Sequence, residues 1–211
     1  MAAPPKIQLV DFNGMFNVDG FTDFVIESNM ESWGLDYKVV AIMGPQSSGK
    51  STLLNQVFGT SFTEMDAMKG RSQTTQGIWM ARSPVVDDPL LVMDLEGNDG
   101  RERGEDDTAF EKQATLFAMA SADILLVNMW SHDVGRETGS GKPLLKTVLE
   151  VNLKLFNQKR TVLLFVFRDR TKTPLEYLAS TMSTDMQKIW ESVPKPPQYV
   201  DSPISDFFDI R

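Results

Sequence analysis

The sequence predicts an α/β fold in which helices cover a doubly wound, mainly parallel sheet. Short apolar segments such as 38–43, 90–95 and 161–167 are typical of strands that are buried on both faces. Between them lie longer segments whose apolar residues recur every three to four positions, which is the spacing of an amphipathic helix. Strands and helices that alternate along one chain build a parallel sheet with helices packed on its faces. A length of 211 residues is enough for one such domain with a sizeable core.

The expected elements follow the chain in order. We expect a short edge strand over 7–10, then a helix that Asp19 or Thr22 caps and that runs to about Ser32. Further strands are expected over 38–43, 77–82, 90–95, 124–127 and 161–167, and 207–210 begins another. Further helices are expected over 52–58, 108–122, 144–155 and 175–189.

Composition excludes several classes of protein. Hydrophobic residues make up 41% of the chain and charged residues 24%, as in an ordinary globular domain. The net charge of −8 argues against a broad nucleic-acid-binding face, so no nucleic-acid partner is expected. The longest apolar run, Val162–Phe167, has six residues, far fewer than the roughly 18 that span a bilayer. We therefore expect a soluble chain with no membrane segment, and the absence of cysteine suits the cytosol.

One stretch carries the clearest chemistry. Residues 44–52 read Gly-Pro-Gln-Ser-Ser-Gly-Lys-Ser-Thr and fit the phosphate-loop pattern G-x-x-x-x-G-K-[ST] at every fixed position. Gly44 and Gly49 have no side chain, so the backbone can curl around a phosphate and point its N–H groups inward. Lys50 supplies a charge for the β- and γ-phosphates, and the Ser51 hydroxyl can ligate Mg²⁺. An apolar strand before the loop and a helix after it complete the context of a nucleotide-phosphate site.

A phosphate loop alone leaves kinases, ATPases and GTPases open, and further segments narrow the choice. Residues 94–97 read Asp-Leu-Glu-Gly, a D-x-x-G element that directly follows an apolar strand. Asp94 can hold the Mg²⁺ shell through water and the Gly97 N–H can contact the γ-phosphate, although Asp94 could also simply cap the strand end. Thr75 is the expected second Mg²⁺ hydroxyl, with Thr74 as the alternative. The expected metal ligands are Ser51, Thr75 and Asp94.

The base-binding element is expected at the end of the last long strand. Residues 167–169 read Phe-Arg-Asp, and the ligand crevice of a doubly wound sheet lies at such strand ends. Asp169 can accept two hydrogen bonds from the N1–H and exocyclic amine of guanine, a donor pair that adenine lacks. The alternative is that Asp169 pairs with a neighbouring arginine or lysine. The residues expected to bind the nucleotide are Gly44, Gln46, Ser47, Ser48, Gly49, Lys50, Ser51, Thr52, Arg168 and Asp169.

These motifs together resemble one family. The combination of GPQSSGKST, QTTQGIW, DLEGNDGRERGEDD and FRD resembles the dynamin superfamily, and more closely its root hair defective 3 and atlastin branch, whose guanine element is Arg-Asp. The resemblance implies a GTPase that binds GTP or GDP with Mg²⁺ and forms a nucleotide-dependent homodimer. It also implies action at the cytosolic face of the endoplasmic reticulum membrane, where such proteins drive homotypic membrane fusion.

The resemblance also implies a division of the chain. Residues 1–36 are expected to form an N-terminal segment that packs on the G domain, and residues 37–211 a partial G domain. The family's full proteins continue into the rest of the G domain, a helical region and a membrane hairpin, so we expect a chain truncated at its C-terminus.

The catalytic residues implied by the resemblance are Gln46, Ser47, Lys50, Thr75 and Gly97. Atlastin carries an arginine at the position of Ser47, whereas the Gln46-Ser47 pair resembles dynamin, and Gln46 could orient the attacking water. The charge of the transition state must then be met by a bound cation or by an arginine such as Arg71 or Arg101.

Two other functions remain open on the sequence. The chain could be a nucleotide-gated interaction module without turnover, because the domain is incomplete. An ATP-using phosphate-loop enzyme is the third reading, which the Phe-Arg-Asp element disfavours.

Overall fold

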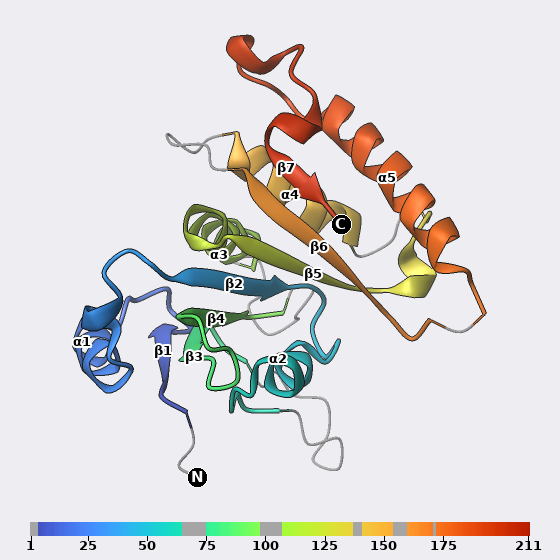
Figure 1. The fold of residues 1–211 in the computed structure, drawn as a ribbon. Helices are drawn as coiled ribbons and strands as arrows, with labels where there is room; N and C mark the ends of the chain where they lie inside the picture. Colours follow the sequence, from blue (N-terminus) through green and yellow to red (C-terminus); the bar gives the residue numbers. More distant parts are fainter. Residues whose placement is uncertain (1–3, 65–74, 98–106, 137–140, 154–159, 171) are drawn as a thin grey trace.

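The computed structural model describes residues 4–64, 75–97, 107–136, 141–153, 160–170 and 172–211. The strands in these ranges form one seven-stranded mixed sheet in the order β1-β3-β4-β2-β5-β6-β7 (Figure 1). Neighbours from β4 to β7 run parallel, and β3 lies antiparallel to both β1 and β4. The prediction of a doubly wound, mainly parallel α/β sheet is confirmed. The strands are β1 (Lys6–Val10), β2 (Lys38–Met43), β3 (Ile78–Arg82), β4 (Leu90–Leu95), β5 (Ile124–Trp130), β6 (Thr161–Arg168) and β7 (Phe208–Ile210).

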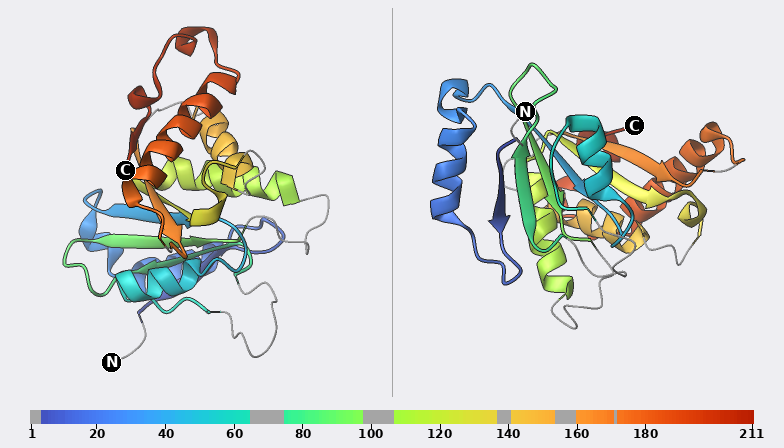
Figure 2. Two further views of the ribbon diagram at one scale, coloured as in Figure 1. Left: turned by 90° about the vertical axis from the view of Figure 1, so that its right-hand side faces the viewer. Right: turned by 90° about the horizontal axis from the view of Figure 1, so that it is seen from below.

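Helices cover both faces of this sheet. The α-helices are α1 (Val18–Glu27), α2 (Lys50–Phe58), α3 (Asp107–Ser121), α4 (Gly141–Asn152) and α5 (Leu175–Ser192). Short 3₁₀ helices are η1 (Met30–Trp33), η4 (Ser131–Asp133), η5 (Pro197–Tyr199) and η6 (Ile204–Asp206). Helix α2 lies on one face, while α3, α4 and α5 lie on the opposite face (Figure 2). Among the helices of the described residues, none combines the length and apolar character needed to cross a bilayer.

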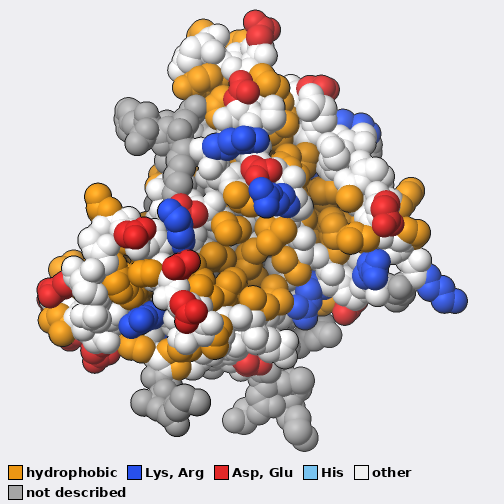
Figure 3. Space-filling model, viewed as in Figure 1, with side chains coloured by type: hydrophobic (Ala, Val, Ile, Leu, Met, Phe, Trp, Pro, Cys, Tyr) orange, Lys and Arg blue, Asp and Glu red, His pale blue; other side chains and the backbone are white. Residues whose placement is uncertain are grey.

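The two faces of the sheet differ in how completely they are covered. On the α2 face, Leu126 of β5 is buried next to Leu164 of β6, its partner in the strand register, which is 37% exposed. The hydrophobic side chains that gather across the middle of Figure 3 lie over this part of β5 and β6. This exposure follows from the layout of the helices, because α2 packs over β2 and β4 and does not extend across β6.

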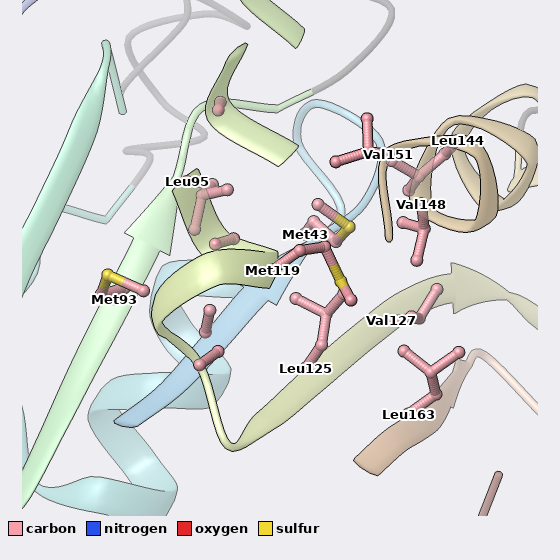
Figure 4. Packing of buried hydrophobic residues seen from close by; sticks show 14 of the residues in the cluster. Met43, Met93, Leu95, Met119, Leu125, Val127, Leu144, Val148, Val151 and Leu163 are labelled. Carbon is pink, nitrogen blue, oxygen red and sulfur yellow. The ribbon is translucent and has the colours of Figure 1, made fainter. Parts of the chain in front are cut away.

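The main core lies between the sheet and helices α3 and α4. Met119 of α3 packs beside Met43 of β2 and Leu125 of β5, and Val148 of α4 faces Val127 (Figure 4). All five side chains are at most 2% exposed. Burying one side chain of this size contributes about 1.5–3 kcal/mol to the stability of the fold. The cluster therefore holds helices α3 and α4 against strands β2 and β5.

The start and end of the first helix differ from the sequence prediction. Asn17 is the cap of α1, because its side-chain oxygen accepts a hydrogen bond from the Gly20 N–H at 3.0 Å. Asp19 and Thr22, the predicted caps, lie inside the helix instead. The helix ends at Glu27 rather than near Ser32, because Asn29 adopts a left-handed conformation (φ 55°) that interrupts the helical turn before η1.

The connections place one strand at the centre of the topology. From β2 the chain enters α2 on one face of the sheet, while the later helix α3 crosses the other face from β4 to β5. Strands β4 and β5 are the two neighbours of β2, so the strand order reverses at the end of β2. In open α/β sheets ligands bind at the carboxyl ends of strands next to such a switch point.

Candidate nucleotide-binding site

The loop after β2 has the backbone shape of an anion cradle. Residues 44–49 connect β2 to α2, and Ser47 (φ 58°) and Gly49 (φ 76°) have left-handed conformations. Turns with such alternations can point successive N–H groups into one concavity. Gly44 packs so closely on β5 that a Cβ atom there would lie 2.1 Å from the Asn128 carbonyl oxygen. The loop therefore needs its first glycine for close packing as well as for backbone conformation.

The ammonium of the loop lysine is buried, which disfavours its charged form. Lys50 is 6% exposed, and its ammonium donates hydrogen bonds to the carbonyl oxygens of Gly44 and Pro45, each at 3.1 Å. Burial lowers the pKa of Lys50 from 10.5 to about 8, although the charges of Asp94 and Glu96 oppose this shift. An anion bound beside the ammonium would raise the pKa again, so the site favours a bound phosphate.

Three oxygen-bearing side chains from distant parts of the chain meet beside the loop. The Ser51 hydroxyl donates to Asp94 Oδ2 at 2.7 Å, and the Thr75 hydroxyl donates to the same oxygen at 3.2 Å. The two hydroxyl oxygens are 3.1 Å apart. Burial raises the pKa of Asp94, and the charge of Lys50 and the two hydroxyl hydrogen bonds offset part of that rise.

These oxygens fit a small hard cation. Asp94 is 1% exposed, and its Oδ1 atom has no hydrogen-bond partner among the described residues. A cavity of about 10 Å³ adjoins the group and is lined by Phe62, Thr63, Thr75, Trp79 and Asp94. That volume is about one water-sized sphere. Hydroxyl and carboxylate oxygens are the ligands that Mg²⁺ prefers, so the donor set and the space suit this ion.

The D-x-x-G segment lies against the phosphate loop. A Cβ atom on Gly97 would lie 2.5 Å from Gln46 Cα and 2.9 Å from Lys50 Nζ, so only glycine fits there. The neighbouring Glu96 carboxylate accepts a hydrogen bond from the Gly77 N–H at 2.6 Å. This hydrogen bond joins the D-x-x-G segment to the residue just before β3, two residues after Thr75.

The Arg-Asp element lies at the same edge of the sheet. The Arg168 guanidinium approaches the loop so closely that Nη2 would be 3.0 Å from a Cβ atom on Gly49. Asp169 is exposed, with φ 53°, and its backbone oxygen accepts a hydrogen bond from the Ser131 hydroxyl at 3.1 Å. Within the described ranges its carboxylate forms no ion pair with Arg168, Arg170 or Lys172, so it is available to a ligand.

Other predicted residues occupy the loop and the first turn of α2. Ser47 is exposed and Gln46 is half-buried at the mouth of the loop. The hydroxyl of Thr52, a predicted nucleotide ligand, donates to Glu64 Oε2 at 2.7 Å, which leaves its backbone N–H as the group for a nucleotide. Hydrogen bonds from Asn55 and Thr52 lower the pKa of Glu64. Thr74, Arg71 and Arg101 lie outside the described residues.

Two residues of the site have no counterpart in the sequence motifs. Glu96 occupies a variable position of D-x-x-G, so the pattern said nothing about its contact with Gly77. Asn128 donates hydrogen bonds to Ser48, and the one available signal was a polar residue inside the otherwise apolar segment Ile124–Trp130.

The fold and the site together define a class of protein. A phosphate loop at the switch point, a hydroxyl–carboxylate group for a cation and a D-x-x-G segment packed on the loop are the parts of a P-loop GTPase domain.

Comparison with known proteins gives the particular family. The profile of the "Root hair defective 3 GTP-binding protein (RHD3) GTPase domain" matches residues 43–211. The chain is 59% identical over 206 residues to Protein ROOT HAIR DEFECTIVE 3 homolog 1 of Arabidopsis thaliana, and the aligned region covers 98% of this chain and 26% of the relative. It is 45% identical over 220 residues to the Protein SEY1 homolog of Dictyostelium discoideum, covering 97% of this chain and 25% of that protein. The chain belongs to the root hair defective 3 GTPase-domain family, as the sequence motifs predicted.

Two further findings set the scope of this assignment. The chain spans about a quarter of the length of the curated relatives that it matches. Among solved structures, Toc33 from Arabidopsis thaliana superposes with a TM-score of 0.53 at 15% identity, covering 97% of this chain and 81% of Toc33. That likeness concerns the fold.

Proposed function

We propose that this domain binds GTP together with Mg²⁺ and hydrolyses the γ-phosphate. The observation that carries the proposal is the convergence of Ser51, Thr75 and Asp94 on one point beside the Lys50 ammonium. Family membership supports the choice of GTP, because the matching profile is that of a GTPase domain. Chemistry of this kind depends on positioning and on electrostatic stabilisation, and it requires no covalent intermediate with the protein.

Each group then has a role at the triphosphate. The N–H groups of the loop and the Lys50 ammonium bind the β- and γ-phosphates. The hydroxyls of Ser51 and Thr75 hold Mg²⁺, and Asp94 holds its water shell. When bound there, Mg²⁺ would supply positive charge to the phosphate oxygens. The Gly97 N–H contacts the γ-phosphate, and Gln46 orients the attacking water.

Base selection falls to the Arg-Asp element. The Asp169 carboxylate accepts hydrogen bonds from the N1–H and the exocyclic amine of guanine. Its exposure and its lack of an ion pair within the described ranges support this role. Arg168 lies beside Gly49 and contributes positive charge near the phosphates. Arg71 and Arg101 remain the proposed sources of further charge in the transition state.

The cellular role follows from the family. We infer that the domain belongs to a larger protein at the cytosolic face of the endoplasmic reticulum, that it forms a nucleotide-dependent homodimer, and that it drives homotypic membrane fusion. The division into residues 1–36 and a partial G domain over 37–211 is part of the same proposal. It is supported by the family match, which begins at residue 43, and by the pairing of β1 with β3, which attaches the N-terminal segment to the edge of the sheet.

Single-turnover phosphate release tests the proposal. The domain, in excess over GTP, is mixed with the nucleotide in the presence of either Mg²⁺ or EDTA, and the released phosphate is measured. A parallel reaction uses ATP in place of GTP. We expect Mg²⁺-dependent phosphate release from GTP and little release from ATP. In Ser51→Ala, release from GTP with Mg²⁺ should fall to the level seen with EDTA. Tight GTP binding without release would instead support the nucleotide-gated module without turnover. Equal release from ATP and GTP would contradict the role of Asp169.

A further inference from the structure

A buried asparagine on β5 forms hydrogen bonds with the phosphate loop. Asn128 is 0% exposed and is the one amide in the strand Ile124–Trp130. The strand register pairs Met43 with Val127. The residues that follow them, Gly44 and Asn128, therefore lie next to each other where the loop begins. The close approach of Gly44 to the Asn128 carbonyl oxygen places this residue directly under the loop.

The amide of Asn128 reaches across the loop to its far side. Nδ2 donates one hydrogen bond to the Ser48 carbonyl oxygen at 3.0 Å and another to Ser48 Oγ at 2.7 Å. The Ser48 hydroxyl in turn donates to the Pro45 carbonyl oxygen at 2.7 Å. A carbonyl oxygen can only accept, so the atom of Asn128 that faces it is the NH₂ group. The contacts link the two sides of the loop to one fixed strand.

The geometry of a peptide group turns this contact into a statement about the phosphate site. In a trans peptide the C=O of one residue and the N–H of the next point in opposite directions. No cis peptide occurs in the described part of the chain. If Asn128 holds the Ser48 carbonyl on the strand side, the Gly49 N–H points to the opposite side, where the loop encloses its ligand. The left-handed conformation of Gly49 and its place as the N-cap of α2 suit an N–H in an anion cradle.

We propose that Asn128 is a positioning residue of the phosphate loop, which aims the Gly49 N–H at the nucleotide phosphates by anchoring the Ser48 carbonyl. This inference rests on the proposed function, because it assumes that the loop binds a nucleoside phosphate. The second amide atom supports it: Asn128 Oδ1 is buried without a hydrogen-bond partner among the described residues. An apolar side chain of similar size would avoid that buried polar atom, so the NH₂ donors explain why an amide occupies the position.

The test is a nucleotide titration of Asn128→Leu, which keeps the side-chain size and removes both donors. The matched control is Asn152→Leu on α4, a second buried asparagine (1% exposed) on the opposite face of the sheet. Dissociation constants are measured for GDP, GTP and inosine triphosphate, and thermal stability is measured without nucleotide. We expect Asn128→Leu to weaken GDP and GTP about tenfold each, which corresponds to the loss of about one hydrogen bond.

The base readout separates positioning from general damage. Inosine lacks the exocyclic amine that Asp169 would bind, so the ratio of GTP to inosine triphosphate affinity reports the base site. We expect this ratio to be unchanged in Asn128→Leu, and Asn152→Leu to bind as the parent does. Ser48→Ala, which keeps the carbonyl acceptor, should lose less affinity than Asn128→Leu.

Three outcomes decide the matter. Parent-like GDP and GTP affinity in Asn128→Leu, or an equal loss in Asn152→Leu, would overturn the inference. If Asn128→Leu does not fold, Asn128→Ser replaces it, because its hydroxyl is too short to reach the Ser48 carbonyl, and the same loss is expected. Failure of the parent domain to bind GDP or GTP would overturn the proposed function itself, which the parent titration reports independently of any variant.

Discussion

Replacing Lys50 should stabilise the nucleotide-free domain while abolishing nucleotide binding. The pKa of Lys50 falls from 10.5 to about 8 because burial disfavours its charge more strongly than Asp94 and Glu96 support it. A shift of this size corresponds to about 3 kcal/mol of unfavourable free energy for the charged form at neutral pH. Lys50→Met removes the buried charge and keeps most of the apolar stem. We therefore expect the free energy of unfolding at pH 7 to rise by about 1–2 kcal/mol, because the hydrogen bonds to Gly44 and Pro45 and the charge that supports Asp94 are lost with the ammonium.

The sign of the pH dependence gives a second, independent readout. Between pH 8 and 10.5 the unfolded chain holds a proton on this lysine and the folded domain does not, so the stability contributed by Lys50 rises with pH. The advantage of Lys50→Met over the parent should thus be largest below pH 8 and should shrink as the pH approaches 10.5.

Urea unfolding without nucleotide at several pH values measures both effects, with Lys188→Met on the exposed surface of α5 as the control. Nucleotide titration of the same variants should show no GTP binding in Lys50→Met and parent-like binding in Lys188→Met. A Lys50→Met domain that is less stable than the parent at pH 7, with a difference that does not vary with pH, would refute the reasoning.

Three further predictions address other parts of the site and the fold. Thr75→Ala should weaken Mg²⁺-dependent GTP binding about tenfold and leave GDP within about twofold, because we expect the Thr75 hydroxyl to contact the ion when the γ-phosphate is present. Equal losses for both nucleotides in a titration would contradict this. Asp169→Asn should lower GTP affinity at least about tenfold and favour xanthosine triphosphate, whose C2 carbonyl accepts from the new amide; competition binding measures this, and unchanged GTP affinity would remove Asp169 from the base site. Asn17→Ala should lower the free energy of unfolding by about 1 kcal/mol, because a helix cap is lost, without changing nucleotide affinity. Thr22→Ala is its control, since the Thr22 hydroxyl donates to the Val18 carbonyl within the helix and does not cap its end, and an equal loss there would reject Asn17 as the cap.

The start of α1 illustrates why some local features were not predictable. Asp19 and Asn17 are both good cap residues, and the sequence offers no reason to prefer one of them. The choice depends on the turn that brings the chain back onto β1, where Phe16 bridges to Val10 and the Asn17 N–H donates to the Leu9 carbonyl at 3.0 Å. These contacts pin residue 17 at the helix start, so tertiary packing overrides the local preference for a later cap.

Contacts inside the site show the same limit at longer range. The G-x-x-x-x-G-K-[ST] pattern specifies which residues form the loop, but Asn128 lies 80 residues away from Ser48 along the chain. Its role depends on β5 lying beside β2, which is set by the crossover through α3. Likewise, Thr52 directly follows the phosphate-loop pattern, and no motif indicated that its hydroxyl bonds to Glu64, which the loop after α2 brings back over that helix.

The sequence by itself determined the α/β class, the phosphate loop, the D-x-x-G and Arg-Asp segments and the family to which they belong. Those features depend on local chemistry: glycines that permit left-handed backbone, a lysine and a serine at a helix start, and apolar runs with strand or helix spacing. The tertiary structure alone decided that Thr75 and Ser51 meet on one oxygen of Asp94, that Glu96 holds Gly77, and that Asn128 anchors the loop. Each of these contacts joins residues from different strands or loops. Their distances follow from strand order and register, which no short stretch of sequence encodes.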